Sequence, residues 1–219
     1  MITNSYELLL FLKKQGYIRD NRDEFWWPNS GTFEVVVGAI LTQQTKWEKV
    51  EKSLQNLRDK NFLNLESLAS IDYKELALLI KPSGFYNTKA KNLKKLCFNI
   101  VQDYKTFDNF KTQVSKEWLL SQKGIGQESC DSILCYASKK EVMVVDSYTN
   151  RLLSAFGYEF ESYEEIQNWL EIGICENFDK ISSEYDGDLN KIYARFHGKI
   201  VEFCKEHMRG KRIDLEELS

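Results

Sequence analysis

The sequence predicts an all-α protein, and three observations lead to this prediction. Apolar residues recur at the 3.6-residue period of a helix in many segments, and no strand pair with a hairpin turn stands out. Only two prolines occur, Pro28 and Pro82, and both lie at breaks between these segments. The chain has no repeat and no low-complexity segment. The predicted helices span residues 3–15, 32–43, 46–59, 73–81, 88–104, 115–122, 127–138, 147–156, 163–177 and 188–207.

Polar residues at the start of three predicted helices are expected to cap them. Asp72 precedes one helix, Ser115 begins another, and Asp146 lies between an apolar run at 143–145 and the helix from 147. A short polar side chain at such a position accepts a hydrogen bond from a first-turn N–H that has no partner within the helix. We therefore predict that these helices begin at those residues.

The composition indicates a globular protein. A chain of 219 residues can bury a real core and form one or two domains. Apolar residues make up 42% and aromatic residues 13%, which excludes a disordered chain. No run of about eighteen apolar residues occurs, so we expect no membrane span. The first sixteen residues read as an amphipathic helix and not as a signal peptide, which favours a cytoplasmic protein with reduced cysteines.

The net charge of −3 counts against a nucleic-acid binder, but the charge is distributed unevenly. Residues 86–105 carry five lysines against Asp103 alone, and residues 191–212 carry seven basic residues against Glu202 and Glu206. A basic helix face is usually solvated surface. Two of them beside a phosphate-binding turn would favour weak, salt-sensitive DNA binding.

Residues 119–157 carry the strongest functional signal. Two short helices flank a Gly-Ile-Gly turn at Gly124, Ile125 and Gly126, and Asp146 follows twenty residues after the second glycine. The glycines permit positive φ, so amides of the turn and of the next helix can converge on one phosphate. Such a contact holds DNA without reading its sequence. Taken singly, such a turn is more often only a turn, and such an Asp more often only a cap.

The combination resembles the helix–hairpin–helix DNA glycosylases of the endonuclease III superfamily. Their pattern is roughly LPGVGxKTA and then VDTHVxR, and the chain reads QKGIGQESC and VDSYTNR. Residues 33–50 and 80–93 resemble two further blocks of the family, in the right order. Lys123 stands where the family has a proline. Within QKGIGQESC and VDSYTNR, the residues that match the family pattern are Gly124, Gly126, Val145, Asp146 and Arg151.

The resemblance implies a fold of two helical domains with an interdomain cleft. Residues 31–139 would form the domain that bears the hairpin. Residues 1–30 and 140–219 would form the second domain from both chain ends. The active site would lie in the cleft between them, where Asp146 falls.

The resemblance also implies residue roles. Asp146 would stay ionised, stabilise the positive charge that develops on the sugar, and orient or deprotonate the attacking water. Gln43 matches the residue that fills the gap left by a flipped nucleotide, and Gln44 is the alternative. The hairpin residues that would contact DNA are Lys123, Gly124, Ile125, Gly126, Gln127 and Glu128.

One departure from the family concerns the lyase reaction. Members with lyase activity carry a lysine two residues after the second glycine of the hairpin, and this amine forms a Schiff base with the sugar. Glu128 occupies that position, and a carboxylate cannot form an imine. We therefore predict a monofunctional glycosylase, although Lys123 and Lys139 lie nearby in sequence.

A second departure concerns cysteine. Many relatives end in C-x6-C-x2-C-x5-C, which binds an iron–sulfur cluster. The five cysteines here are scattered, and their spacing assembles no cluster and no zinc site. We expect no metal and no other cofactor, and we expect small buried core residues at Cys97, Cys130, Cys135, Cys175 and Cys204.

Tryptophans suggest the substrate. Trp26 and Trp27 precede Pro28, and Trp47 follows the LTQQT loop. Adjacent tryptophans usually belong to a core, but a flipped base needs flat apolar walls, and electron-rich indoles attract a cationic base such as 3-methyladenine. The segments WWP, LTQQTKW, PSGFYN and ARFHGK resemble the 3-methyladenine DNA glycosylase branch of epsilon-proteobacteria. We assign no role to His197 and Lys199 in the last of these segments.

The resulting hypothesis is a monomeric glycosylase that removes alkylated bases from double-stranded DNA and binds no membrane. Three alternatives compete with it: a bifunctional glycosylase for oxidised pyrimidines, an adenine-mismatch glycosylase, and a non-enzymatic DNA-binding module. Glu128 and the absent cysteine motif count against the first. The chain length leaves no room for the extra domain of the second, and Asp146 at the catalytic position counts against the third.

Overall fold

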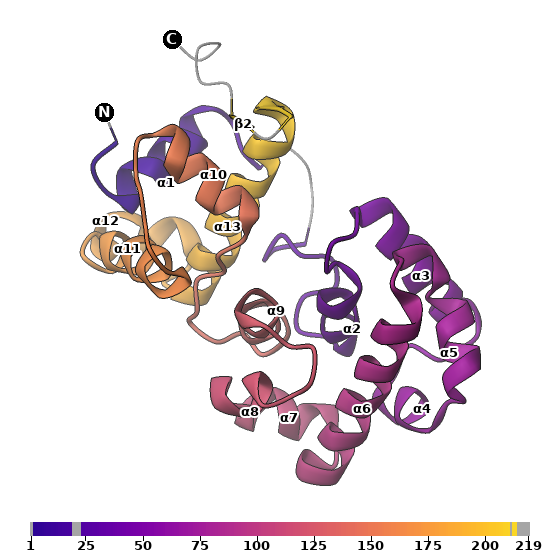
Figure 1. Cartoon of the computed structure of the whole chain (residues 1–219). Coiled ribbons are helices and arrows are strands. Elements are labelled where there is room, and N and C mark those ends of the chain that lie inside the picture. Colours follow the sequence, from indigo (N-terminus) through magenta and orange to yellow (C-terminus); the bar gives the residue numbers. More distant parts are fainter. Residues whose placement is uncertain (1, 19–22, 211, 214–219) are drawn as a thin grey trace. The chain divides into compact units, whose positions relative to one another are not determined.

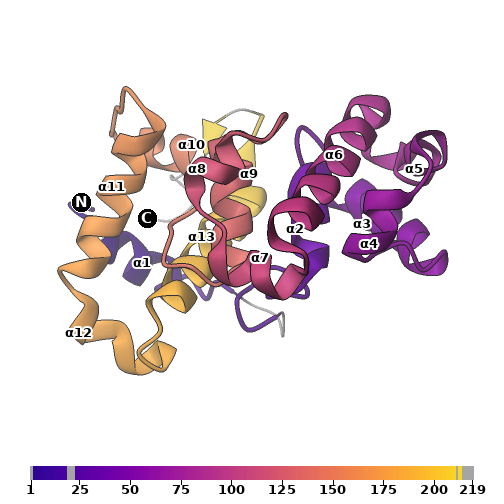
Figure 2. The same ribbon diagram turned by 90° about the horizontal axis from the view of Figure 1, so that it is seen from below.

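A computed structural model gives the fold and describes residues 2–18, 23–210 and 212–213. The regular structure of these residues is helical except for one short antiparallel strand pair, β1 (Met208–Arg209) with β2 (Arg212–Ile213). The predicted all-α fold is therefore confirmed (Figures 1 and 2). No helix in these ranges is long and apolar enough to cross a membrane. Lys211, one of the basic residues of segment 191–212, lies outside the described residues.

The chain divides into two compact units. We call Asn29–Lys139 the inner unit, and Met1–Pro28 together with Lys140–Ser219 the terminal unit. The terminal unit is made from both ends of the chain.

The inner unit is built around α2 (Phe33–Leu41), whose residues are buried on almost every side. A helix that is apolar all round is stable only inside a core. Around it pack α3 (Trp47–Asp59), α6 (Tyr86–Tyr104), α9 (Gln127–Ser132) and the π-helical turn Ile133–Ala137. The shorter elements of this unit are α4 (Leu65–Ser70), α5 (Tyr73–Leu79), the 3₁₀ turn Lys81–Ser83, α7 (Phe107–Gln113) and α8 (Lys116–Leu120).

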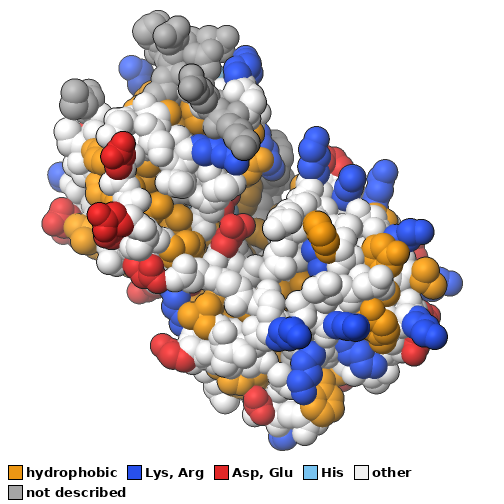
Figure 3. All heavy atoms as spheres, in the orientation of Figure 1, with side chains coloured by type: hydrophobic (Ala, Val, Ile, Leu, Met, Phe, Trp, Pro, Cys, Tyr) orange, Lys and Arg blue, Asp and Glu red, His pale blue; other side chains and the backbone are white. Residues whose placement is uncertain are grey.

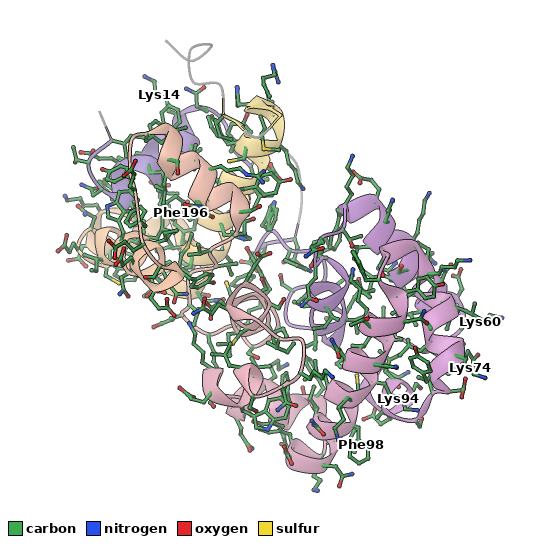
Figure 4. The ribbon with its side chains drawn as sticks, in the orientation of Figure 1. Lys14, Lys60, Lys74, Lys94, Phe98 and Phe196 are labelled. Carbon is green, nitrogen blue, oxygen red and sulfur yellow. The ribbon has the colours of Figure 1, made fainter. Side chains whose placement is uncertain are left out.

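The terminal unit has a separate core beneath α13 (Leu189–His207), the longest of its helices in the described chain. Leu8 and Leu12 of α1 (Ser5–Lys14) are fully buried there, as is Phe196 of α13, which Figure 4 shows within this unit. The other helical elements are α10 (Ser147–Ala155), α11 (Tyr163–Cys175), α12 (Phe178–Ile181) and the 3₁₀ turn Ser182–Tyr185. This core fixes α13 and α10 against each other, and these two helices carry the candidate catalytic residues.

The helix caps follow the sequence closely. The Asp72 carboxylate accepts hydrogen bonds from the N–H groups of Lys74 and Glu75, and the Ser115 hydroxyl accepts one from Trp118 N–H. The predicted caps are confirmed. The predicted helix 127–138 changes to π-helical geometry after residue 132.

Several short elements were absent from the prediction. These are α4, α7, α12 and the strand pair, each of which spans seven residues or fewer. Such short segments show too few turns for an apolar period to emerge. The prediction for the cysteines was wrong at one position, because Cys175 is exposed whereas Cys97, Cys130, Cys135 and Cys204 are buried.

Candidate active site

Asp146 forms the N-cap of α10, as predicted. Its Oδ1 accepts a hydrogen bond from Thr149 N–H at 2.8 Å and one from Thr149 Oγ1 at 3.0 Å. These bonds fix the rotamer of the carboxylate and leave Oδ2 outside the cap. The side chain is 12% exposed, so a small part of it remains open to solvent.

His197 of α13 lies on the other side of the carboxylate. Its Nε2 is 3.5 Å from Asp146 Oδ2, and its side chain is 5% exposed. Burial alone would raise the pKa of Asp146, but the nearby His197 and the two hydrogen bonds from Thr149 outweigh burial and lower this pKa. The carboxylate is therefore ionised at neutral pH, although water reaches little of it.

Trp26 lies beside His197 in the same unit, and Trp27 lies beside Trp26. The Trp26 ring makes an edge-on contact with His197, with centroids 5.5 Å apart, and another with Trp27 at 6.4 Å. Trp26 Nε1 also donates a hydrogen bond to Glu202 Oε1 at 2.9 Å. Both indoles are only 8% exposed. We call Asp146, His197, Trp26 and Trp27 the Asp146 cluster.

Gly198 explains how Trp26 approaches α13 so closely. A Cβ at this position would lie 2.3 Å from Trp26 Cγ, so only glycine leaves room for the indole against the helix backbone. The next residue, Lys199, is also buried, and its Nζ donates to Tyr17 O. Burial lowers the pKa of Lys199 to about 8. Trp26 is thus held by α13 and in turn supports His197.

The Gly-Ile-Gly turn of the inner unit joins α8 to α9. Gly124 has φ +85, and a Cβ there would lie 2.1 Å from the Asn92 side chain of α6. This turn therefore needs glycine for its conformation and for its close packing. Gly126 adopts φ −98 as the N-cap of α9, so the expected use of positive φ holds only at Gly124. Ile125 is buried, and Lys123 and Glu128 are exposed.

A buried ion pair fixes the angle of this hairpin. Asp131 of α9 is fully buried, and Lys116 Nζ of α8 lies 3.0 Å from its Oδ1. The pair joins the helices on either side of the turn, so the amide groups at the start of α9 keep a fixed direction. An N-terminal helix end with fixed amides suits a phosphate.

Gln43 and Gln44 lie in the loop between α2 and α3 and differ in their surroundings. Gln43 Nε2 donates to Gly124 O and to Ser129 Oγ, each at 2.9 Å, so this side chain is bound to the hairpin. Gln44 is exposed and has the left-handed φ of +51. Trp47 begins α3 and is half-buried in the inner unit.

Basic side chains spread over the inner unit face seen in Figure 3, around α3, α5 and α6, and Lys60 and Lys74 project outward in Figure 4. Lys91 and Lys95 of α6 are exposed, and Asn92 between them contacts the hairpin. In segment 191–212 of the terminal unit, several of the basic side chains are paired or buried. Lys191 pairs with Glu24 and Asp186, Arg195 bonds to Glu24 O, and Lys199 is buried.

Among the described residues, the structure suggests a role for three that the sequence did not predict: His197, Phe85 and Lys89. His197 stands out only through its distance to Asp146. Phe85 is 69% exposed and has φ +44 immediately after Gly84, which is an unusual place for an aromatic residue. Lys89 lies on the apolar face of α6, between Tyr86 and Leu93 in the helical period. Lys89 and Leu93 are buried, and Tyr86 is partly buried. A charged residue on an apolar face was the available signal.

Nothing in the described ranges groups three or more His, Cys, Asp or Glu side chains into a metal site. The terminal unit brings together the Asp146 carboxylate, the His197 imidazole and the indoles of Trp26 and Trp27.

The comparisons with known proteins place this geometry in a family. The sequence profile of the HhH-GPD superfamily of base excision DNA repair proteins matches residues 37–173. A Methanocaldococcus jannaschii protein described as a DNA repair glycosylase is 38% identical over 86% of this chain and 83% of its own length. Endonuclease III of Thermotoga maritima is 28% identical over 58% of this chain and 57% of its own length.

Solved structures give the same result. The crystal structure of H. pylori 3-methyladenine DNA glycosylase MagIII, bound to 1,N6-ethenoadenine, is 47% identical, has a TM-score of 0.91 and covers 94% of this chain and 100% of that one. A trapped endonuclease III–DNA covalent intermediate has a TM-score of 0.75 at 18% identity, and covers 98% of this chain and 92% of that one; this likeness shows the fold alone. The chain therefore belongs to the HhH-GPD superfamily of base excision DNA repair proteins, within the endonuclease III superfamily, and is a DNA glycosylase.

Proposed function

We propose that this protein is a monofunctional DNA glycosylase that flips out alkylated purines, chiefly 3-methyladenine, and excises them by hydrolysis. The observation that carries the proposal is the Asp146 cluster, in which an ionised, nearly buried carboxylate lies 3.5 Å from His197. The His197 ring contacts Trp26, and Trp26 contacts Trp27. The 47% identity to the H. pylori enzyme, which covers nearly the whole chain, supports the substrate class. We further propose that the protein acts as a monomer.

DNA is held through its backbone in this proposal. The amides at the start of α9 bind one phosphate, and the exposed lysines of α6 and Lys123 contribute charge to the same face of the inner unit. Glu128 lies in the first turn of α9 and opposes this charge. Binding is therefore expected to be weak and sensitive to salt.

Gln44 and Phe85 are the residues that we assign to the gap left by the flipped nucleotide. Both are exposed, and both have left-handed φ values that non-glycine residues rarely adopt. Gln43 matches the family position, but its amide is already bound to the hairpin. We therefore assign Gln43 to fixing the loop and Gln44 to filling the gap.

The chemistry that we propose begins with cleavage of the glycosidic bond. Its electron pair goes to the base, and an N-alkylated purine that carries a positive charge leaves as a neutral base. Asp146 stabilises the cation that remains on the sugar, and its Oδ2 orients the water whose oxygen attacks the anomeric carbon. The water proton passes to this carboxylate or to solvent. His197 keeps Asp146 ionised through its position near Oδ2.

A base-release assay with three duplex substrates tests this function. One substrate is methylated DNA, the second contains an oxidised pyrimidine, and the third is undamaged. We expect release of 3-methyladenine from the first alone. Preferred release of the oxidised pyrimidine would favour the bifunctional class, and binding without release of any base would favour the non-enzymatic DNA-binding module.

The lack of lyase activity gives a separate prediction. Because Glu128 occupies the position of the imine-forming lysine, borohydride should trap no covalent adduct with abasic DNA. Strands should break only after alkali or an abasic-site endonuclease is added. A bifunctional glycosylase run in parallel provides the positive control. If an adduct forms, Lys123→Met and Lys139→Met would identify the amine responsible, and the monofunctional assignment would be withdrawn.

A further inference from the structure

Lys89 is buried in the first turn of α6 and joins three parts of the inner unit. The residue is 4% exposed. Its Nζ donates to Leu41 O at 2.8 Å, to Thr45 Oγ1 at 2.8 Å and to Ser83 O at 2.9 Å. An ammonium group has three N–H donors, so these bonds use all of them. All three acceptors are neutral oxygens.

A buried ammonium is a costly way to join neutral groups. Removal of the charge from water is unfavourable, and burial lowers the pKa of Lys89 to about 8. An apolar side chain of similar volume would avoid this cost, but it would remove the Lys89 donor from the oxygens of Leu41, Thr45 and Ser83. The buried ammonium is therefore tied to the loops that carry these oxygens.

Two of the three acceptor residues lie close in sequence to Gln44 and Phe85, the two exposed residues with left-handed φ. Thr45 directly follows Gln44, and Ser83 precedes Phe85 by two positions. Thr45 Oγ1 also donates to Ser83 O at 2.6 Å, so the two loops are bonded to each other as well as to Lys89. Non-glycine residues at positive φ persist only where their surroundings hold them. The bonds from Lys89 to Thr45 and Ser83 fix both loops at once.

We propose that Lys89 is a positioning residue that sets Gln44 and Phe85 as a coupled pair, so that the two side chains enter the gap in the DNA together. This inference rests on the proposed function, because it assumes that the enzyme fills a gap left by an extruded nucleotide. It adds to that function a residue that does not touch DNA and acts through two loops.

Binding to two duplexes tests the proposal. One duplex carries a tetrahydrofuran abasic-site analogue, and the other is the same sequence undamaged. We expect Lys89→Met to reduce the preference for the abasic-analogue duplex by roughly fivefold to a hundredfold, the range that follows from loss of one stacking contact. Thr45→Val leaves the ammonium in place but removes the bridging hydroxyl, and it should reduce the preference in the same direction.

Lys94→Met is the matched control. Lys94 lies on the same helix and its Nζ donates to Ile71 O, so this variant also removes one charge and one bond to a carbonyl. It should weaken binding to both duplexes equally and leave the preference unchanged. Melting temperatures of all variants identify any that are unfolded, and Thr45→Val provides the answer if Lys89→Met does not fold.

A double-mutant comparison distinguishes positioning from a general structural role. In a Gln44→Ala, Phe85→Ala background, Lys89→Met should change the preference by less than about twofold, because the residues through which it acts are gone. The proposal would be overturned if folded Lys89→Met kept the wild-type preference for the abasic-analogue duplex. It would also be overturned if Lys89→Met reduced this preference as much in the double-alanine background as in the wild type. If the wild type itself binds both duplexes equally, gap filling and this inference both fail. Failure of the Lys89 comparison alone leaves base excision intact.

Discussion

Asp146→Asn is expected to lose roughly 10²–10⁴-fold in the rate of base release, the range for loss of a positioned acid–base group. The fold should remain, because asparagine also caps helices well and can accept the hydrogen bond from Thr149 N–H. Loss of the negative charge removes the group that we propose stabilises the sugar cation. The measurement is single-turnover release of 3-methyladenine from methylated duplex under saturating enzyme.

Binding separates a catalytic from a structural effect of this substitution. Asp146→Asn should bind an abasic-analogue duplex with wild-type affinity, within about threefold, because no contact of the hairpin or of the Gln44 loop is altered. An unchanged release rate in the folded variant would remove Asp146 from the chemistry.

The pH dependence of stability provides a second measure of the Asp146 environment. The pKa of Asp146 is lowered in the folded state, so its ionised form contributes stability above the unfolded value of about 3.9. This contribution is lost as pH falls through the lower, folded value. The difference in unfolding free energy between wild type and Asp146→Asn should therefore be constant near neutral pH and shrink below about pH 4. A difference that grows with acidification would contradict the assigned direction.

Removal of an indole is expected to have the next largest effect. Trp27→Ala and Trp47→Ala should each raise the barrier to 3-methyladenine release by roughly 1–3 kcal/mol, the scale of one base–aromatic stack. Trp26 is a weaker candidate for stacking, because its ring packs against Gly198, makes a T-shaped contact with His197, and donates a hydrogen bond from Nε1 to Glu202. The measurement is kcat/KM for release from methylated duplex.

Stability must be controlled in this series, since truncation of a buried tryptophan can cost about 3–5 kcal/mol by itself. Trp169→Ala is the matched control: this indole of α11 packs against Tyr158 and Phe160 and is partly buried, and its loss should leave kcat/KM unchanged. Folded Trp47→Ala with wild-type kcat/KM would assign that indole to packing and leave the stacking role to Trp27.

The charge of the base gives an independent test of the indoles. A cation over an indole face is stabilised by about 0.5–2 kcal/mol relative to a neutral base. Wild-type enzyme should therefore release cationic 3-methyladenine faster than neutral hypoxanthine. Equal rates would exclude cation–π selection even if both indoles contact the base.

The all-α fold and the helix caps could be read from the sequence because they depend on local chemistry. An apolar period of 3.6 residues marks a helix that buries one face, and this held for every long helix. Asp72, Ser115 and Asp146 could be identified because a capping side chain bonds to amides two or three residues away in the chain. The helices α4 and α7 also begin at capping side chains, Asn64 and Thr106, but they are too short to show an apolar period, as are α12 and the π-helical turn.

Only part of the candidate site could be predicted from the sequence. The sequence named Asp146 and the tryptophans through motif and resemblance, but the partner of Asp146 comes from α13, 51 positions further along the chain. The same holds for Gln43, whose bonds to Gly124 and Ser129 span more than eighty positions. A periodic pattern carries no information on which side chains meet across such separations.

The sequence by itself determined the helices, their starts and the family motif of this protein, because each depends on neighbouring residues and on the type of side chain. Only the tertiary structure decided that His197 faces Asp146, that Trp26 packs on Gly198, and that Lys89 joins two loops. These contacts arise from the packing of helices distant in sequence. The lowered pKa of Lys89 follows from its burial, which no single segment fixes.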